Sequence, residues 1–135
     1  MKYAVLSGRV LFSLIFLVGG LGHFSPQTIG YAASQGVPFA SMLVPVSGIL
    51  SIAGALSILV GYKARIGAWL IILFLIPVTF FLHKFWTVSD PMMKQMDMVM
   101  FLKNLGLLGG ALFIAFFGAG PLSVDEKTGG YALQV

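Results

Sequence analysis

Residues 66–86 read IGAWLIILFLIPVTFFLHKFW, and before His83 this stretch contains no ionisable side chain. About 20 apolar residues in a helix are enough to cross the hydrocarbon core of a bilayer. Three further stretches have the same character, at about residues 3–22, 41–61 and 99–118, with Arg9 the one interruption of the first. The sequence therefore predicts four transmembrane helices.

The composition agrees with a membrane protein that has no soluble domain. Apolar residues make up 59% of the 135 residues and charged residues only 9%, whereas soluble domains carry about 25% charged residues. We therefore expect an all-α fold, a single membrane domain over residues 1–135, built as an antiparallel four-helix bundle. A net charge of +4 without a basic cluster argues against nucleic-acid binding. The absence of cysteine excludes disulfides and thiolate-ligated metal centres.

The basic residues are divided unevenly between the two sides of the predicted bundle. If the helices alternate in direction, the side of both termini carries Lys2, Arg9, Lys63, Arg65 and Lys127, and the other side carries Lys84, Lys94 and Lys103. Basic residues accumulate on the cytoplasmic side of membrane proteins. The sequence therefore predicts that both termini lie inside, and that the uncharged connection 24–40 is an outward-facing, lid-like loop.

Polar side chains at the ends of the spans are the best candidates for function, because a bilayer tolerates such groups only when they have partners. The end of the first span, the end of the third and the start of the fourth lie on one membrane face. We therefore expect a ligand pocket near the outer interface, built from His23, His83, Trp86, Asp97, Lys103 and Asn104. Arg9 shares a helix face with Ser13, Gly20 and His23, and is a further candidate.

Each of these residues also has an ordinary structural interpretation. Trp86 suits the aromatic belt of a membrane protein, and Asn104 suits hydrogen bonding between helices. Arg9 suits a topology anchor whose charge reaches the interface, and His83 suits a bond to the backbone carbonyl that Pro77 leaves without a donor. We favour a pocket because so many polar groups converge on one face.

Small residues form a separate pattern. Gly19-Gly20-x-Gly22, Ser47-x-x-x-Ser51-x-x-x-Ala55 and Gly106-x-x-x-Gly110 predict close approach of helices. They do not resemble phosphate-binding loops, because no Walker-type Lys-Ser/Thr follows them.

Methionine is concentrated in residues 91–100, which hold five of the seven methionines. Thioethers near an imidazole are ligands that Cu(I) prefers, whereas methionine also serves as a flexible apolar filler. The thioethers would scatter around a helix, so we expect a structural role and no metal site.

Several short motifs, taken in order, resemble those of a known family. They are Arg9-x-x-Phe12, Gly19-Gly20-x-Gly22-His23-Phe24, Gly36-Val37-Pro38, Gly61-Tyr62-x-x-Arg65-x-Gly67-Ala68, His83-x-Phe85-Trp86, Phe101-x-Lys103-Asn104-Leu105-x-x-x-Gly109-Gly110 and Gly118-x-Gly120-Pro121-x-Ser123-x-Asp125. Over residues 5–125 this order resembles the DoxX family, in its YphA/YqjF-like bacterial inner-membrane form.

That resemblance implies a multi-pass protein of the bacterial inner membrane, with a link to quinone and sulfur redox chemistry. The family often has a lysine where this chain has Gly22-His23-Phe24, which weakens any transfer of a substrate role. We expect a quinone-interacting protein: a redox subunit, as the membrane component of a quinone-linked oxidoreductase, or a quinone-resistance factor. Phe85 and Trp86 would form an aromatic wall, and no cofactor would be covalently bound.

Two alternatives remain open from the sequence. The first is a non-enzymatic membrane subunit that docks and stabilises a partner. The second, minor alternative is a protein that handles a metal or a small solute. Beside the bilayer, the expected partners are a quinone, a soluble or membrane redox protein, or further copies of the chain.

Overall fold

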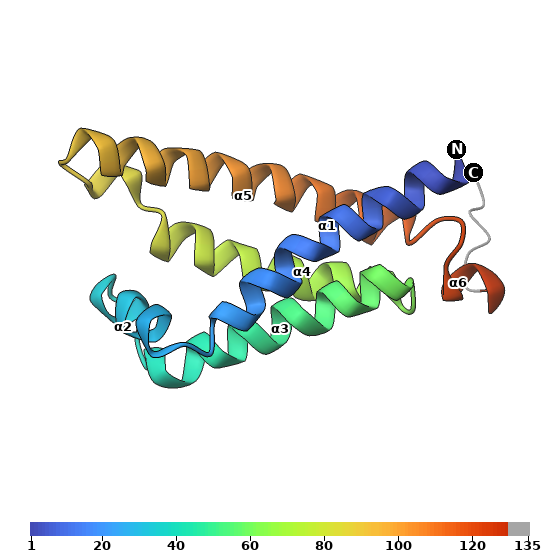
Figure 1. The fold of residues 1–135 in the computed structure, drawn as a ribbon, viewed down its shortest axis with the longest axis horizontal. Coiled ribbons are helices and arrows are strands. Elements are labelled where there is room, and N and C mark those ends of the chain that lie inside the picture. Colours follow the sequence, from blue (N-terminus) through green and yellow to red (C-terminus); the bar gives the residue numbers. More distant parts are fainter. Residues whose placement is uncertain (130–135) are drawn as a thin grey trace.

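The structure, a computed structural model, describes residues 1–129, and over that range it is helical without strands (Figure 1). The long helices are α1 (Lys2–Gly22), α3 (Ala40–Val60), α4 (Ala64–Leu82) and α5 (Pro91–Phe117). The short ones are α2 (Pro26–Ser34), the 3-10 helix η1 (Phe85–Thr87) and α6 (Val124–Lys127). Four described helices are long and apolar enough to cross a membrane, which confirms the predicted all-α membrane fold.

The long helices pack in sequence, α1 against α3, α3 against α4 and α4 against α5. Figure 1 shows that the start of α1 and the short α6 lie at one end of the bundle, while α2 and η1 lie at the other. At the end with α2 and η1, α1 and α5 diverge from each other. The candidate site lies in that region.

Close helix crossings occur where the sequence places glycine. A Cβ added to Gly48 of α3 would lie 2.9 Å from the carbonyl oxygen of Gly20 in α1, and one added to Gly54 would lie 2.8 Å from that of Gly67 in α4. Ser51 lies fully buried in α3 and donates to the Phe16 carbonyl of α1 at 2.9 Å. The predicted role of small residues in helix packing is therefore confirmed at these crossings.

The third predicted span, residues 66–86, falls within the candidate membrane span Ala64–Thr87, but it is not one continuous helix. The sequence predicted a helix through Trp86, but α4 stops at Leu82 and His83 is its C-cap, with φ −118° and ψ 48°. Aromatic residues continue through η1, so hydrophobicity could not mark where the helix stops. As a result His83 and Trp86 do not share a helix face with Thr79.

The fourth predicted span is wrong at its start, because α5 begins at Pro91 and not near residue 99. The Asp90 carboxylate accepts a hydrogen bond from the Met93 amide at 2.8 Å, which satisfies a donor that the first turn leaves free. Proline suits the first helical position because its nitrogen has no hydrogen to bond. The methionine-rich segment and Asp97 are therefore helical.

The connection 24–40, predicted as a lid-like loop, contains a helix. Ser25 caps α2, its hydroxyl accepting from the Thr28 amide at 3.2 Å, and Pro26 occupies the first helical position. Ala32 of α2 is buried against Ala40 and Val44 of α3. The connection therefore covers the end of the bundle as an ordered helix.

Candidate ligand-binding site

A cleft with a volume of about 170 Å³ lies between α1, α4 and α5. Its polar lining comes from His23 at the end of α1, Ser51 on α3, His83 at the end of α4, and Lys103 and Asn104 on α5. Four of the residues predicted from the sequence thus meet in one place, as the topology argument anticipated. The remaining wall is largely aliphatic and aromatic.

His83, which lines this cleft, contacts Asp97 of α5, which does not. The Nδ1 atom of His83 lies 3.5 Å from Oδ1 of Asp97, and each side chain is 20% exposed. That distance is beyond the usual length of an N–H···O hydrogen bond, and among the described residues Nδ1 is a buried atom without such a bond. Asp97 belongs to α5, so the two helices meet here through an ion-pair contact and not through a closed hydrogen bond.

Asn104 lies deeper in the cleft than Asp97 and on the same face of α5. It is seven residues further along, two helical turns or about 10 Å, and only 5% exposed. Its side-chain amide makes no hydrogen bond to another residue in the range 1–129. Lys103, next to it and exposed, directs its Nζ atom to the Met100 sulfur at 3.4 Å. The cleft therefore offers an amide and an ammonium donor.

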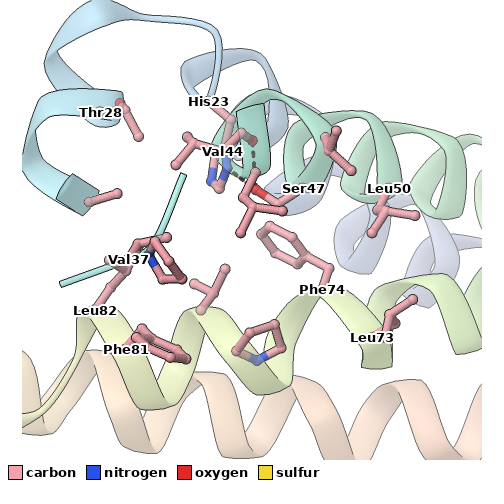
Figure 2. A pocket seen from close by; sticks show the side chains of 16 residues that line it. His23, Thr28, Val37, Val44, Ser47, Leu50, Leu73, Phe74, Phe81 and Leu82 are labelled. Atoms are coloured by element: carbon pink, nitrogen blue, oxygen red, sulfur yellow. Dashed lines mark hydrogen bonds between the residues drawn. The ribbon is translucent and has the colours of Figure 1, made fainter. Parts of the chain in front are cut away.

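His23 is held by Ser47 of α3, as Figure 2 shows. The Ser47 hydroxyl donates to the Val44 carbonyl at 2.7 Å, so its single proton is used there. The Nδ1 atom of His23, 2.8 Å from the Ser47 oxygen, is then the donor, which leaves Nε2 as an acceptor. Burial lowers the pKa of His23, which follows the last residue of α1, and the Val44 backbone partly opposes that shift. The ring is therefore neutral at pH 7.

Trp86 does not line this cleft, which corrects the predicted aromatic wall. It is 52% exposed and packs edge-on against Phe101 of α5, with ring centroids 5.8 Å apart. Phe85 packs against the same ring at 5.4 Å. This arrangement fits the aromatic-belt interpretation of a residue at a membrane interface.

Arg9 lies at the other end of the bundle and is not part of the cleft. It is buried, 4% exposed, and donates to the carbonyls of Ala119 at 3.0 Å, Pro121 at 3.3 Å and Leu122 at 2.8 Å. These carbonyls belong to the segment after α5. The guanidinium therefore holds the C-terminal segment against α1.

Asp125 completes this arrangement from the other direction. Its carboxylate accepts from the amides of Lys63 at 2.8 Å and Ala64 at 3.0 Å, and so caps α4 from α6. Gly61 has φ +72°, and a Cβ there would collide with Ser123. We call Arg9, Gly61, Ser123 and Asp125 the terminal clasp; it accounts structurally for the motifs at residues 61–68 and 118–125.

A second, larger cavity was not predicted from the sequence. It has a volume of about 360 Å³ and lies between α2, α3 and α4 (Figure 2). Apolar side chains dominate its wall, among them Val44, Leu50, Leu73, Phe81 and Leu82. The one signal in the sequence for a helix over this cavity was the pair Ser25-Pro26, because serine before proline is typical of a helix start.

The methionine segment forms the exposed first turns of α5. Met92, Met93 and Met96 are 74%, 53% and 54% exposed, so they do not enclose a common point. Within residues 1–129 no three His, Cys, Asp or Glu side chains gather closely enough to hold a metal ion.

Comparison with known proteins gives full-length matches. The model of the SURF4 family matches residues 1–131. Inner membrane protein YqjF of Escherichia coli is 31% identical over 128 residues, covering 90% of this chain and 89% of that protein. Inner membrane protein YphA of the same organism is 26% identical over 125 residues, covering 91% and 89%.

A eukaryotic protein also matches. The Surfeit locus protein 4 homolog of Schizosaccharomyces pombe is 29% identical over 126 residues, which cover 93% of this chain but 37% of that protein. No solved structure matches the chain.

These findings overturn the DoxX assignment. The similarity to YphA and YqjF is present, but the family model that matches is that of SURF4. Several of the motifs contribute to helix crossings and to the terminal clasp, which stabilise the bundle. Such motifs do not discriminate between families that share this fold. The redox association followed from DoxX alone and loses its support.

Proposed function

This chain belongs to the SURF4 family, and on that premise we propose that it binds a small, lipid-soluble, amphipathic molecule in the cleft between α1, α4 and α5. It is an integral, multi-pass inner membrane protein, as its two bacterial relatives are by name. The observation that supports the proposal is that His83, Lys103 and Asn104 line one cavity, with Asp97 in contact with His83.

The polar groups of the cleft are energetically costly without a ligand. An amide moved into an apolar medium without a hydrogen-bond partner costs roughly 2–7 kcal/mol. Among the described residues the His83 Nδ1 atom is buried without such a partner, and Asn104 is a buried polar residue on the same cleft. Ionisable groups inside a membrane protein commonly mark a site of function. A bound head group would supply the missing hydrogen bonds.

The donors and acceptors define the chemistry of that head group. Asn104 and Lys103 donate, whereas Asp97 and the Nε2 atom of His23 accept. The head should therefore carry carbonyl, hydroxyl or carboxylate oxygens. A quinone is the most specific candidate, because it is lipid-soluble and has two carbonyl acceptors. Binding requires no electron transfer, and we propose no catalysis.

The test is direct binding in lipid nanodiscs. We expect 2,3-dimethoxy-5-methylbenzoquinone or decanoate to bind the wild-type protein, and His83→Leu and Asn104→Leu each to weaken that binding by about tenfold, the effect of losing one buried hydrogen bond. Gln27→Leu on exposed α2 removes a polar group at the same end of the bundle and should change nothing. If decanoate binds and the benzoquinone does not, the ligand is an anionic lipid and not a quinone.

Unchanged binding of both probes by folded His83→Leu and Asn104→Leu proteins would refute the proposal. Thermal unfolding should separate this outcome from misfolding. Leucine suits a membrane-embedded position better than histidine or asparagine does, so both variants should insert and fold.

A second candidate function is supported by a different observation. On α5 a Cβ added at Gly106 or Gly109 would meet no atom within 4 Å, and only Asn104 and Ala111 of that helix are buried. Open glycines on a membrane helix permit close approach of another helix. The chain would then dock a partner in the membrane along α5, without binding a small molecule.

A further inference from the structure

We infer that the apolar cavity between α2, α3 and α4 holds the hydrocarbon tail of the molecule whose head group occupies the polar cleft. This inference rests on the proposed function and specifies its ligand class: an amphipathic lipid with a small oxygen-bearing head and an extended apolar chain.

The cavity wall is mainly apolar and therefore suits a hydrocarbon group. Its volume of about 360 Å³ falls in the range of roughly 300–1,000 Å³ typical of ligand pockets. Three polar side chains line it, and each is already engaged: His23 with Ser47 at 2.8 Å, Ser47 with the Val44 carbonyl at 2.7 Å, and Thr28 with Ser25 at 2.9 Å. Each of the three polar side chains of this wall therefore already has a hydrogen-bond partner.

The two cavities share one wall. His23, Phe74 and Val78 line both of them, and the rings of His23 and Phe74 lie 5.4 Å apart, inclined at 55°. A head group in the cleft and a tail in the apolar cavity would therefore contact the same three side chains from opposite sides. The two cavities are therefore neighbours, and the inference requires that one bent molecule pass the edge of this wall to occupy both.

The cavity is open to the bilayer on one side and covered by α2 on another. Leu73 and Phe81, on its rim, are 59% and 43% exposed, so a chain can enter from the lipid. Two bonds tie the α2 connection to the end of α4: Tyr31 donates to the Leu82 carbonyl at 3.4 Å, and Lys84 donates to the Gln35 carbonyl at 2.9 Å. The cover is therefore fixed where the tail would lie.

The test compares two probes with the same head. One is 2,3-dimethoxy-5-methylbenzoquinone, which has no tail, and the other is decylubiquinone, which adds ten carbons. Val44→Phe fills the cavity, because Val44 is buried on its wall. Val60→Phe is the matched control, because Val60 lies on the same helix, is 53% exposed and does not line the cavity.

We expect Val44→Phe to weaken decylubiquinone binding by at least about tenfold, the effect of leaving two or more methylene groups unburied, and to leave the tailless probe unchanged. Val60→Phe should affect neither probe. If Val44→Phe does not fold, Leu50→Phe, on the half-buried part of the same wall, should give the same pattern.

Other outcomes separate this inference from the proposed function. Equal decylubiquinone binding by the Val44→Phe and Val60→Phe proteins would overturn the inference, while a His83→Leu effect on the tailless probe would still support the cleft. If Val44→Phe weakens decylubiquinone binding and His83→Leu does not, both the head-group site in the cleft and its connection to the tail cavity would be overturned. A competition experiment gives a further test, in which a diazirine-bearing phosphatidylethanolamine labels the cavity in the presence of decylubiquinone. If decylubiquinone does not reduce the labelling, the occupant of the cavity is a bilayer lipid and the inference is overturned.

Discussion

Arg9 illustrates how a charge is accommodated inside an apolar helix. Its guanidinium has five donor hydrogens in a fixed plane, and it reaches three backbone carbonyls of residues 119–122. Those carbonyls follow the end of α5, where no further helical turn supplies donors. Asp125 and Glu126 lie near enough to stabilise the charge. The residue therefore joins the first and last parts of the chain.

Replacement of Arg9 by methionine should destabilise the protein by roughly 2–5 kcal/mol, because several buried carbonyls would lose their donor at once. We expect the midpoint of thermal unfolding in detergent to fall by about 5 °C or more. Lys2→Met, which removes an exposed cation from the same end of α1, is the control and should leave the midpoint unchanged. Equal midpoints for the two variants would show that the terminal clasp does not depend on Arg9.

At the level of the element, α5 combines two faces with different surroundings. Asp97, Asn104 and Ala111 are spaced by seven residues and mark the face toward the bundle. Gly110 approaches Phe12 of α1, with an added Cβ only 3.0 Å from that ring, whereas Gly106 and Gly109 have open space. Within the Gly106-x-x-x-Gly110 motif, Gly110 therefore packs inside the chain, and Gly106 is open to a partner helix.

If α5 docks a partner helix, Gly106→Leu should prevent the association, because a leucine side chain keeps two helix backbones apart. Single-molecule photobleaching of the labelled protein in liposomes would report association between copies, and co-purification would report another partner. Gly8→Leu, at an equally open glycine of α1, is the matched control. A distribution of assembly sizes that Gly106→Leu leaves unchanged would rule out docking through this face.

At the scale of the whole molecule, the charges and the fold together predict an orientation. Contacts between Arg9 and Leu122, and between Asp125 and the Lys63 amide, place the first part of α1, the α3–α4 connection and α6 at one end. Lys84, Lys103 and the cleft lie at the other end. The positive-inside rule then predicts that the cleft opens toward the outer side.

Because the chain contains no cysteine, single cysteine variants can test this orientation without background. A membrane-impermeant maleimide applied to intact cells should label Ser34→Cys, at the end of α2, and should not label Thr128→Cys, beyond α6, until the membrane is opened. Labelling of Thr128→Cys in intact cells would reverse the orientation and place the cleft on the cytoplasmic side.

The amino-acid sequence was enough to predict four spans, helix packing through small residues, and a common membrane face for His23, His83, Lys103 and Asn104. These features follow from hydrophobic length, from side-chain size and from the alternation of helices across a bilayer, and each can be read along the chain. The predicted helix ends were less accurate at two places. Aromatic residues continue past the end of α4 at Leu82, so hydrophobicity does not mark that end. Asp90-Pro91 was interpreted as a break between spans, although Asp90 caps α5 and Pro91 is its first residue.

Contacts between distant segments exclude two of the predicted polar residues, Arg9 and Trp86, from the cleft. Arg9 lies on the same face of α1 as Ser13 and Gly20, yet it belongs to the terminal clasp, because its partners are 110 or more residues away in the chain. Trp86 does not line the cleft, because α4 ends at Leu82, four residues before it. The apolar cavity exists because α2 folds back over α3 and α4. Contacts between distant segments create these features, and no local pattern of residues encodes their distances.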